Sequence, residues 1–310
     1  MSSFIRDEGT IIGNKYKIIN KIGKGTFGVV YKGENIRTKE LVAIKIETLT
    51  SKHSLLKREA KISRQLEYNN GIAKIKWYGV DSDNIYVVFE LLGVTLSSYI
   101  ERLKKFSLKT TIVLGIQMIE RIKSIHVNGI LHRDIKPDNF IMGRNDTHIL
   151  YIIDFGLSKN YIINNKHIKE RHKKKMIGTV RYASINIHNG IESSRRDDLI
   201  SIGYVLIYFL KGSLPWQGVT AKTKEEKYEK IGKIKQDISI DELCSGLPDK
   251  FKQYFEYCYY LNFDDEPNYH MLCGLLVSML PEKEIYFDKI LYDWDIKLDN
   301  SLIEVDLNSL

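Results

Sequence analysis

A short polar string constrains this chain more than any other feature of its sequence. Residues 132–139 read His-Arg-Asp-Ile-Lys-Pro-Asp-Asn. A carboxylate at Asp134 can accept a proton from an attacking hydroxyl, and the amide of Asn139 can hold Mg²⁺. Lys136 lies between them and can neutralise a phosphate group. The string therefore predicts phosphoryl transfer, provided that the rest of the chain supplies the other parts.

A glycine-rich string near the start of the chain predicts a nucleotide site. Residues 22–30 read Ile-Gly-Lys-Gly-Thr-Phe-Gly-Val-Val. The same glycine spacing occurs in dinucleotide-binding folds, where it opens a helix. Here the residues on both sides, 16–22 and 29–33, are rich in β-branched and aromatic types, which predicts two strands. Without Cβ atoms, the glycines let backbone N–H groups approach a triphosphate. The alternative is an ordinary glycine-rich turn.

Lys45 lies on an apolar strand predicted over residues 41–46. A lysine on a strand would ordinarily face solvent, but this one is also a candidate to bind the α- and β-phosphates, held by a helix carboxylate. Apolar residues at helical spacing predict a helix over residues 54–66, with Glu59 in its middle. Glu47 and Glu67 are rival carboxylates outside that position. The sequence favours Glu59 as the partner of Lys45, against a solvated Glu59.

A second apolar strand, predicted over residues 150–153, ends in Asp154-Phe155-Gly156. Asp154 follows Asp134 by twenty residues. Carboxylate and amide oxygens are the ligands that hard cations such as Mg²⁺ prefer, so Asp154 and Asn139 are the candidate metal ligands. Asp-Phe-Gly alone is a common turn string, and the prediction therefore depends on its place after the strand.

Together these strings resemble the eukaryotic-type protein kinases, over about residues 14–295. Within them the chain resembles the casein kinase 1 family, because Ser184-Ile185-Asn186 stands where most kinases have Ala-Pro-Glu. The strings at residues 90–93, 212–218 and 263–269 are also similar to those of that family. The resemblance implies an α+β, bilobal protein kinase fold. Its N-lobe is a small antiparallel β-sheet with one main helix, and its larger C-lobe is mainly α-helical.

The resemblance and the pattern of elements predict five segments. They are an N-terminal extension at 1–13, the N-lobe at 14–89, a hinge at 90–93, the C-lobe at 94–295 and a short tail at 296–310. Isoleucines at helical spacing predict a helix within residues 103–128. An apolar run at 199–210 predicts a buried helix at the centre of the C-lobe, and it is too short to span a bilayer.

The resemblance implies ATP and Mg²⁺ as cofactors. Catalysis would fall to Asp134, Lys136, Lys45 and Glu59, with Asn139 and Asp154 as metal ligands. The residues implied to contact ATP come from the glycine-rich string, the sheet, the hinge and the floor of the adenine pocket: Ile22, Gly23, Lys24, Gly25, Thr26, Phe27, Gly28, Val29, Val30, Ala43, Lys45, Glu90, Leu92 and Ile141.

Basic residues crowd one part of the chain, whose formal net charge is +8. Between residues 164 and 175 Glu170 is the only acid, among the bases Lys166, Lys169, Arg171, Lys173, Lys174 and Lys175. The resemblance implies an anion site for an acidic or phosphorylated substrate residue, formed by Arg181 and Lys227, and we add the neighbouring Lys224. The alternatives are a solvated basic surface and a nucleic-acid site. No recognition motif for nucleic acid accompanies the charge, so no nucleic-acid partner is expected.

The sequence thus predicts a serine/threonine protein kinase that acts as a monomer on protein substrates with acidic or phosphorylated residues upstream of the target. Lys136 favours Ser or Thr over Tyr as the acceptor. The alternative is a catalytically weak kinase-fold scaffold that binds ATP and protein partners. A small-molecule phosphotransferase would lack Lys136 and the long basic segment. Three cysteines without metal spacing and early charged residues predict an intracellular protein without membrane insertion, in the cytoplasm, the nucleus or, for a viral protein, the virion.

Overall fold

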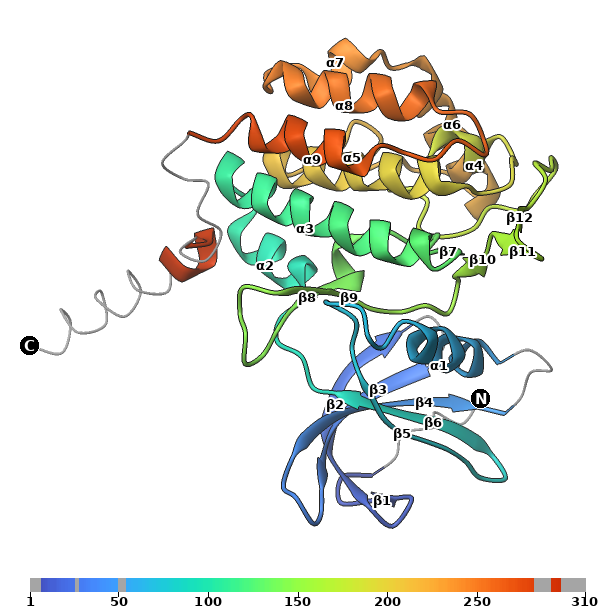
Figure 1. Ribbon diagram of the computed structural model, residues 1–310, viewed down its shortest axis with the longest axis vertical. Coiled ribbons are helices and arrows are strands. Elements are labelled where there is room, and N and C mark those ends of the chain that lie inside the picture. Colours follow the sequence, from blue (N-terminus) through green and yellow to red (C-terminus); the bar gives the residue numbers. More distant parts are fainter. Residues whose placement is uncertain (1–6, 26–27, 50–53, 282–290, 297–310) are drawn as a thin grey trace, which may run out of the picture. The chain divides into compact units, whose positions relative to one another are not determined.

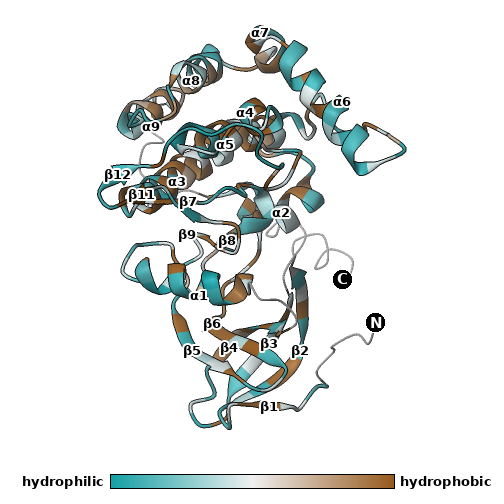
Figure 2. Ribbon diagram, turned by 90° about the vertical axis from the view of Figure 1, so that its right-hand side faces the viewer, coloured by the Kyte–Doolittle hydropathy of each residue, from teal (hydrophilic) through white to brown (hydrophobic). Residues whose placement is uncertain are grey.

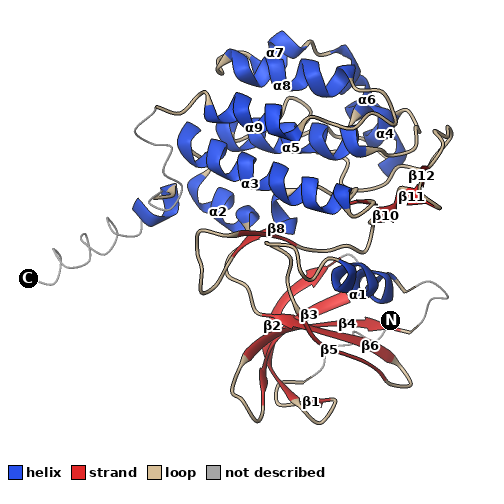
Figure 3. Cartoon of the chain, in the orientation of Figure 1, coloured by secondary structure: helices blue, strands red, loops and turns tan. Residues whose placement is uncertain are grey.

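The computed structural model describes residues 7–25, 28–49, 54–281 and 291–296. Thr26 and Phe27, two predicted nucleotide contacts, lie outside the described residues, as does most of the predicted tail. The chain divides into two compact units, Met1–Val94 with Ile141–Ser158 and Thr95–Phe140 with Lys159–Leu310 (Figure 1). The first is mostly strands and the second mostly helices (Figure 3). The predicted α+β class, a small antiparallel sheet with one main helix and a larger helical part, is confirmed.

The first unit is built on an antiparallel sheet with the strand order β1-β2-β3-β4-β6-β5. β1 lies in the segment that the sequence assigned to an N-terminal extension, and it pairs with β2. A separate two-stranded sheet pairs β8 with β9. The strands are β1 (Ile11–Ile12), β2 (Tyr16–Gly25), β3 (Gly28–Asn35), β4 (Leu41–Thr48), β5 (Ile75–Val80), β6 (Asn84–Glu90), β8 (Phe140–Met142) and β9 (Leu150–Ile152).

Alternation along the strands gives the large sheet two apolar faces. On one face Tyr86 and Val88 of β6 join a core with Tyr16 and Ile44. On the other face the intervening residues of β6, Ile85 and Val87, pack with Leu56 and Ala60 of helix α1 (Leu55–Gln65). Successive strand residues point to opposite faces, so Lys45, which lies opposite Val87 on the neighbouring strand, projects on the α1 side.

The second unit is a set of packed helices around α5, whose residues are buried over most of its length. α3 packs against α5 and α9, and α8 packs against α5. Figure 2 shows α6 as a mostly hydrophilic helix. The helices are α2 (Leu96–Leu103), α3 (Leu108–Val127), α4 (Ile185–His188), α5 (Arg195–Lys211), α6 (Lys224–Asp237), α7 (Ile240–Cys244), α8 (Asp249–Tyr260) and α9 (Tyr269–Val277), and a 3₁₀ turn, η1, lies at Pro137–Asn139.

Four short strands complete the second unit, in two antiparallel pairs. β7 (Ile130–Leu131) pairs with β10 (Lys159–Asn160), and β11 (Ile162–Ile163) pairs with β12 (Lys166–His167). Because β7 immediately precedes the string at residues 132–139, its pairing with β10 ties this string to the start of the basic segment. The strand pair thus fixes the backbone on which the candidate catalytic residues stand.

The helix predicted within residues 103–128 is α3, which begins at Leu108. α2 ends at Leu103, where Lys104 takes a left-handed conformation with φ of 67°. Ser107 then caps α3, because its Oγ accepts a hydrogen bond from the N–H of Thr110 at 3.2 Å. The predicted buried helix at 199–210 lies within α5. None of the helices in the described part of the chain has both the length and the apolar character needed to cross a membrane.

Candidate active site

Lys45, Glu59 and Asp154 meet in the first unit. The Lys45 Nζ lies 2.6 Å from Glu59 Oε2 and 3.4 Å from Asp154 Oδ1. The side chain of Lys45 is 9% exposed and that of Glu59 is 5% exposed. Lysine, glutamate and the Asp-Phe-Gly aspartate, which are far apart in the sequence, therefore form one buried charged cluster.

The rival carboxylate Glu47 has a different place. Its Oε2 accepts hydrogen bonds from Ser54 Oγ at 3.0 Å and from the N–H of Leu56 at 2.6 Å, and its Oε1 accepts from the N–H of Leu55 at 3.3 Å. A carboxylate at the first turn of a helix satisfies free N–H groups and interacts favourably with the helix dipole. Glu47 thus anchors the start of α1, and through α1 it helps to hold Glu59 against Lys45.

Burial and charge act in opposite directions on this cluster. Burial alone would lower the pKa of Lys45, but Glu59 and Asp154 outweigh it and hold that pKa above its ordinary value. Burial raises the pKa of Glu59 even though Lys45 opposes the change. A buried ion pair contributes little net stability, because desolvation offsets the attraction. Its effect here is to keep a charged ammonium in a fixed position where a phosphate oxygen can use it.

The third glycine of the glycine-rich string serves the sheet itself. A Cβ atom at Gly28 would overlap the backbone carbonyl oxygen of Ile46 on the neighbouring strand β4. At Gly23 the nearest atom to such a Cβ would be Val30 Cβ, at 3.9 Å. The sequence attributed all of these glycines to the approach of a triphosphate, whereas the structure requires Gly28 for close packing between strands.

We expect Gly28→Ala to lower the free energy of unfolding by about 1–3 kcal/mol, as other overpacked substitutions do, because a backbone carbonyl cannot move aside as a flexible side chain can. Gly23→Ala is the matched control, and it should change stability by less than about 0.5 kcal/mol because its Cβ would make only an ordinary van der Waals contact with Val30. Chemical denaturation of both variants without nucleotide measures the difference. Equal losses in the two variants would contradict the packing argument.

The other predicted nucleotide contacts in the first unit lie along β2, β3 and β4, at the end of β6 and just after it, and, for Ile141, on β8. Val30 lies opposite Lys45 in the sheet, and Ala43 is two residues from Lys45, so the three share a face. Ile22 is 48% exposed. Glu90 uses its Oε1 to accept from the N–H of Lys74 at 2.8 Å, which steadies the end of β6.

Asp134 is held from three sides in the second unit. Lys136 Nζ lies 2.8 Å from Asp134 Oδ2, and Asn139 Nδ2 donates to the same oxygen at 3.2 Å. Thr179 Oγ1 donates to Asp134 Oδ1 at 2.7 Å. Gly178, before Thr179, has φ of 78° and packs on the carbonyl of Arg133. The three predicted residues are therefore together, and Thr179, which the sequence did not single out, completes the cluster.

A buried aspartate supports the backbone of this string. Asp198 of α5 accepts from the N–H of His132 and the N–H of Arg133, both at 2.8 Å, and its Oδ2 lies 2.9 Å from His126 Nε2. Burial alone would raise the pKa of Asp198, but the contact with His126 and these N–H donors hold it below its ordinary value. The backbone of Arg133, with φ of 69°, is left-handed, a costly conformation that such support can maintain.

The residues present suit Mg²⁺ by their donor chemistry. Asn139 turns its amide N–H toward Asp134, with bonds to the carboxylate and to the backbone carbonyl at 2.8 Å, so its amide oxygen is the atom left to act as a ligand. Asp154 has φ of 65°, and the N–H of Gly156 donates to its Oδ1 at 3.3 Å. Each unit thus presents one oxygen ligand of the type that hard cations prefer.

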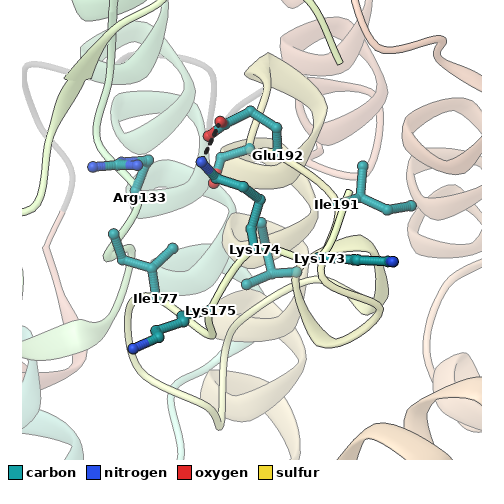
Figure 4. A pocket seen from close by; sticks show the side chains of 9 residues that line it. Arg133, Lys173, Lys174, Lys175, Ile177, Ile191 and Glu192 are labelled. Atoms are coloured by element: carbon teal, nitrogen blue, oxygen red, sulfur yellow. Dashed lines mark ion pairs between the residues drawn. The ribbon is translucent and has the colours of Figure 1, made fainter. Parts of the chain in front are cut away.

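A pocket of about 350 Å³ lies in the basic segment of the second unit (Figure 4). Glu192, which is 3% exposed, lines this pocket. Its Oε2 lies 2.9 Å from Lys159 Nζ and 3.3 Å from Lys174 Nζ. Arg133, Lys173 and Lys175 also line it. The sequence counted Lys174 in the basic cluster, and the structure pairs it with Glu192, which Lys159 also contacts. The local sequence could not predict this ion pair, because Glu192 lies eighteen residues after Lys174.

The three residues of the predicted anion site lie on two elements. Arg181 is exposed, with its guanidinium carbon 5.8 Å from the ring centre of Tyr182 and 5.9 Å from that of Tyr208. Lys224 and Lys227 are exposed on the first turns of α6, and Lys224 Nζ lies over the ring of Tyr228 at 5.5 Å. Within the described residues no ion pair or hydrogen bond joins the three side chains to one another, and the site stays a prediction.

His188 gives the second unit a pH dependence. Burial and, to a smaller extent, the charge of Lys235 lower the pKa of His188 to about 4. In the unfolded chain His188 takes up a proton near pH 6.5, whereas in the folded chain it does so only near pH 4. Protonation therefore favours the unfolded chain, and stability is lost as the pH falls from about 6.5 to 4. We expect a loss of about 1–2 kcal/mol, after allowance for partial exposure of the ring. Unfolding measured at several pH values should give a flatter profile for His188→Gln, and the same profile as the native chain for His270→Gln, which alters an exposed histidine.

A comparison with known families was made on the whole sequence. A family model described as protein kinase domain matches residues 16–274.

Proposed function

Because the chain belongs to the protein kinase family, we propose that it is a serine/threonine kinase of the casein kinase 1 type. It would transfer the γ-phosphate of ATP to Ser or Thr hydroxyls of protein substrates, as a monomer in the cytoplasm or nucleus. The observation that carries the proposal is the contact set around Asp134, in which Lys136, Asn139 and Thr179 hold one carboxylate. The alternative, an inactive scaffold, usually lacks the strand lysine, the catalytic aspartate or the Asp-Phe-Gly aspartate, and this chain retains Lys45, Asp134 and Asp154.

Each residue of the two clusters has a role in this reaction. Asp134 orients the acceptor hydroxyl and takes its proton, and Lys136 stabilises negative charge on the phosphoryl group. Lys45, fixed by Glu59, binds phosphate oxygens of the nucleotide. Asn139 and Asp154 would hold Mg²⁺, which neutralises charge on the phosphates when bound. Positioning and charge stabilisation account for most of the catalysis, because little covalent work is left to the protein.

We further propose that the chain prefers acidic or already phosphorylated sites. Arg181, Lys224 and Lys227 would bind the anionic substrate residue, since guanidinium and ammonium groups suit phosphate. The support is their exposure and the many bases of the preceding segment, of which Lys173 and Lys175 line a pocket. Exposed charges are screened by salt, so the preference should weaken as ionic strength rises.

The experiment is transfer of labelled phosphate from ATP with Mg²⁺ to casein, to a phosphoserine-containing peptide and to its unphosphorylated twin. Asp134→Asn is the blank. Transfer by the native chain that is biased to the phosphorylated peptide supports both parts of the proposal. Unbiased transfer keeps the kinase and removes the proposed preference, whereas ATP binding without transfer favours the scaffold.

The anion site has its own test, the paired change Arg181→Ala with Lys227→Ala. We expect the preference for the phosphorylated peptide over its twin to fall by about tenfold or more, since each charge-assisted contact contributes enough for such a factor. Replacing exposed lysines elsewhere, Lys61→Ala with Lys105→Ala, gives the matched loss of two charges. An unchanged preference in the first pair would rule out this site.

A further inference from the structure

Lys235 is a buried lysine that the catalytic roles above do not use. It lies on α6, an otherwise hydrophilic helix (Figure 2), yet only 5% of its surface is exposed. Its Nζ donates to the backbone carbonyl of Val180 at 2.8 Å and to that of Ala183 at 2.6 Å. Among the described residues no ion pair with a carboxylate is found for it, and burial holds its pKa well below the ordinary value. The two carbonyls that Lys235 binds belong to the segment 179–183, which follows the basic segment.

Two aromatic rings complete the surroundings of the Lys235 ammonium. Its Nζ lies 4.8 Å from the ring centre of Trp216 and 5.0 Å from that of Tyr204, distances at which a cation is attracted to a ring face. Trp216 also donates from its Nε1 to the carbonyl of Arg181 at 2.7 Å. The carbonyls of Val180, Arg181 and Ala183 are therefore held by only two side chains.

The other end of segment 179–183 is fixed as well. Thr179 bonds to Asp134, and Tyr182 is buried. The N–H groups of Tyr182 and Ala183 both donate to the Thr179 carbonyl, at 2.9 and 3.1 Å. With its backbone held on both sides, the segment leaves the Arg181 side chain exposed, over the rings of Tyr182 and Tyr208. The direction in which Arg181 projects is thus set by the contacts of its neighbours.

A buried lysine without a carboxylate partner is a costly way to fill space, because an apolar side chain of similar size packs without desolvating a charge. What the lysine provides is directed donors to two carbonyls at once. We propose that Lys235 is a positioning residue for protein substrates: together with Trp216 it fixes the backbone at 180–183 and thereby the direction of Arg181. This inference rests on the proposed kinase function and assigns a specificity role to a residue that does not touch the substrate.

The kinetic test compares Lys235→Met with Lys235→Arg. We expect Lys235→Met to raise the KM for the phosphorylated peptide by about tenfold, the effect of losing one strong positioning contact, while the KM for ATP and kcat stay within about twofold. Lys235→Arg retains charged donors and should restore part of the loss. Lys211→Met is the matched control, because Lys211 also donates to a carbonyl, that of Leu243 at 2.8 Å, away from this segment.

Hydrogen–deuterium exchange gives a readout that needs no catalysis. The amides of Tyr182 and Ala183 should exchange faster in Lys235→Met and in Trp216→Phe, which removes the Nε1–H donor together with part of the buried ring. Their exchange should be unchanged in Lys211→Met. If Lys235→Met does not fold, Trp216→Phe and Lys235→Arg still decide the matter through exchange and KM. The proposal would be overturned if the exchange of Tyr182 and Ala183 were unchanged in Trp216→Phe and in Lys235→Met. It would also be overturned if the KM values for ATP and for the peptide rose in parallel in the Lys235 variants. Absence of transfer by the native chain would instead refute the kinase function, and the exchange experiment would still test Lys235.

Discussion

Replacement of Asp134 by Asn is expected to lower kcat by about 10²- to 10⁴-fold, the usual effect of removing a group that accepts a proton in the transition state. The amide has nearly the shape of the carboxylate but cannot take the proton of the acceptor hydroxyl. It also brings an N–H group into a space where Thr179, Lys136 and Asn139 all donate to oxygen. Steady-state transfer to casein measures kcat, and nucleotide affinity should change little.

The control for this prediction is Asp138→Asn in the same loop. Asp138 is exposed and lies four residues after Asp134. Asp138→Asn therefore makes the same change of charge in the loop without removing the contacts of Asp134. Its kcat should remain within a few-fold of the native value. Comparable losses of kcat in the two variants would mean that net charge in the loop, and not a proton acceptor at Asp134, determines the rate.

Replacement of Asp198 by Asn should destabilise the helical unit by about 3–5 kcal/mol, the range for breaking a buried charged contact from one side. Asp198 is 3% exposed and accepts from two backbone N–H groups, of His132 and Arg133. An amide in its place can satisfy only part of this set and turns a donor toward other donors. Denaturant unfolding measures the loss, and because the supported backbone carries Asp134, kcat should fall in the same variant.

Asp249→Asn serves as the comparison for the stability effect. Asp249 is also an aspartate in the first turn of a helix, α8, but it is exposed. Its replacement should change the free energy of unfolding by no more than about 0.5 kcal/mol. If Asp198→Asn costs no more than this, the support of the catalytic string must come from other contacts.

The sequence predicted those parts of the site whose residues are fixed by local pattern. β-branched residues around the glycines predicted β2 and β3, and alternation placed Lys45 on a strand. Helical spacing placed Glu59 in mid-helix, where the structure pairs it with Lys45. The exact start of α3 came only from the structure, since the spacing of the isoleucines gives no weight to the left-handed Lys104 or to the Ser107 cap.

The residues that the sequence missed depend on contacts between distant segments. Thr179 reaches a residue forty-five positions earlier, and Lys235 binds carbonyls more than fifty positions away. One signal for Lys235 was present: it lies four residues after Ile231 on α6, and positions four apart share a helix face. Because Lys235 shares a helix face with Ile231, the one buried isoleucine of α6, the sequence could have predicted that Lys235 is buried.

The packing of Gly28 against Ile46 matters for the choice of an inactive variant as a control in cells. Substituting a glycine of this string is an obvious way to prevent nucleotide binding. At Gly28 such a change would also make the protein less stable, so that chaperones and proteases would reduce its abundance. A lost phenotype would then report how much protein remains. Asp134→Asn leaves the close contact between the two strands intact, but its abundance must be measured beside the phenotype, because its amide N–H faces other donors.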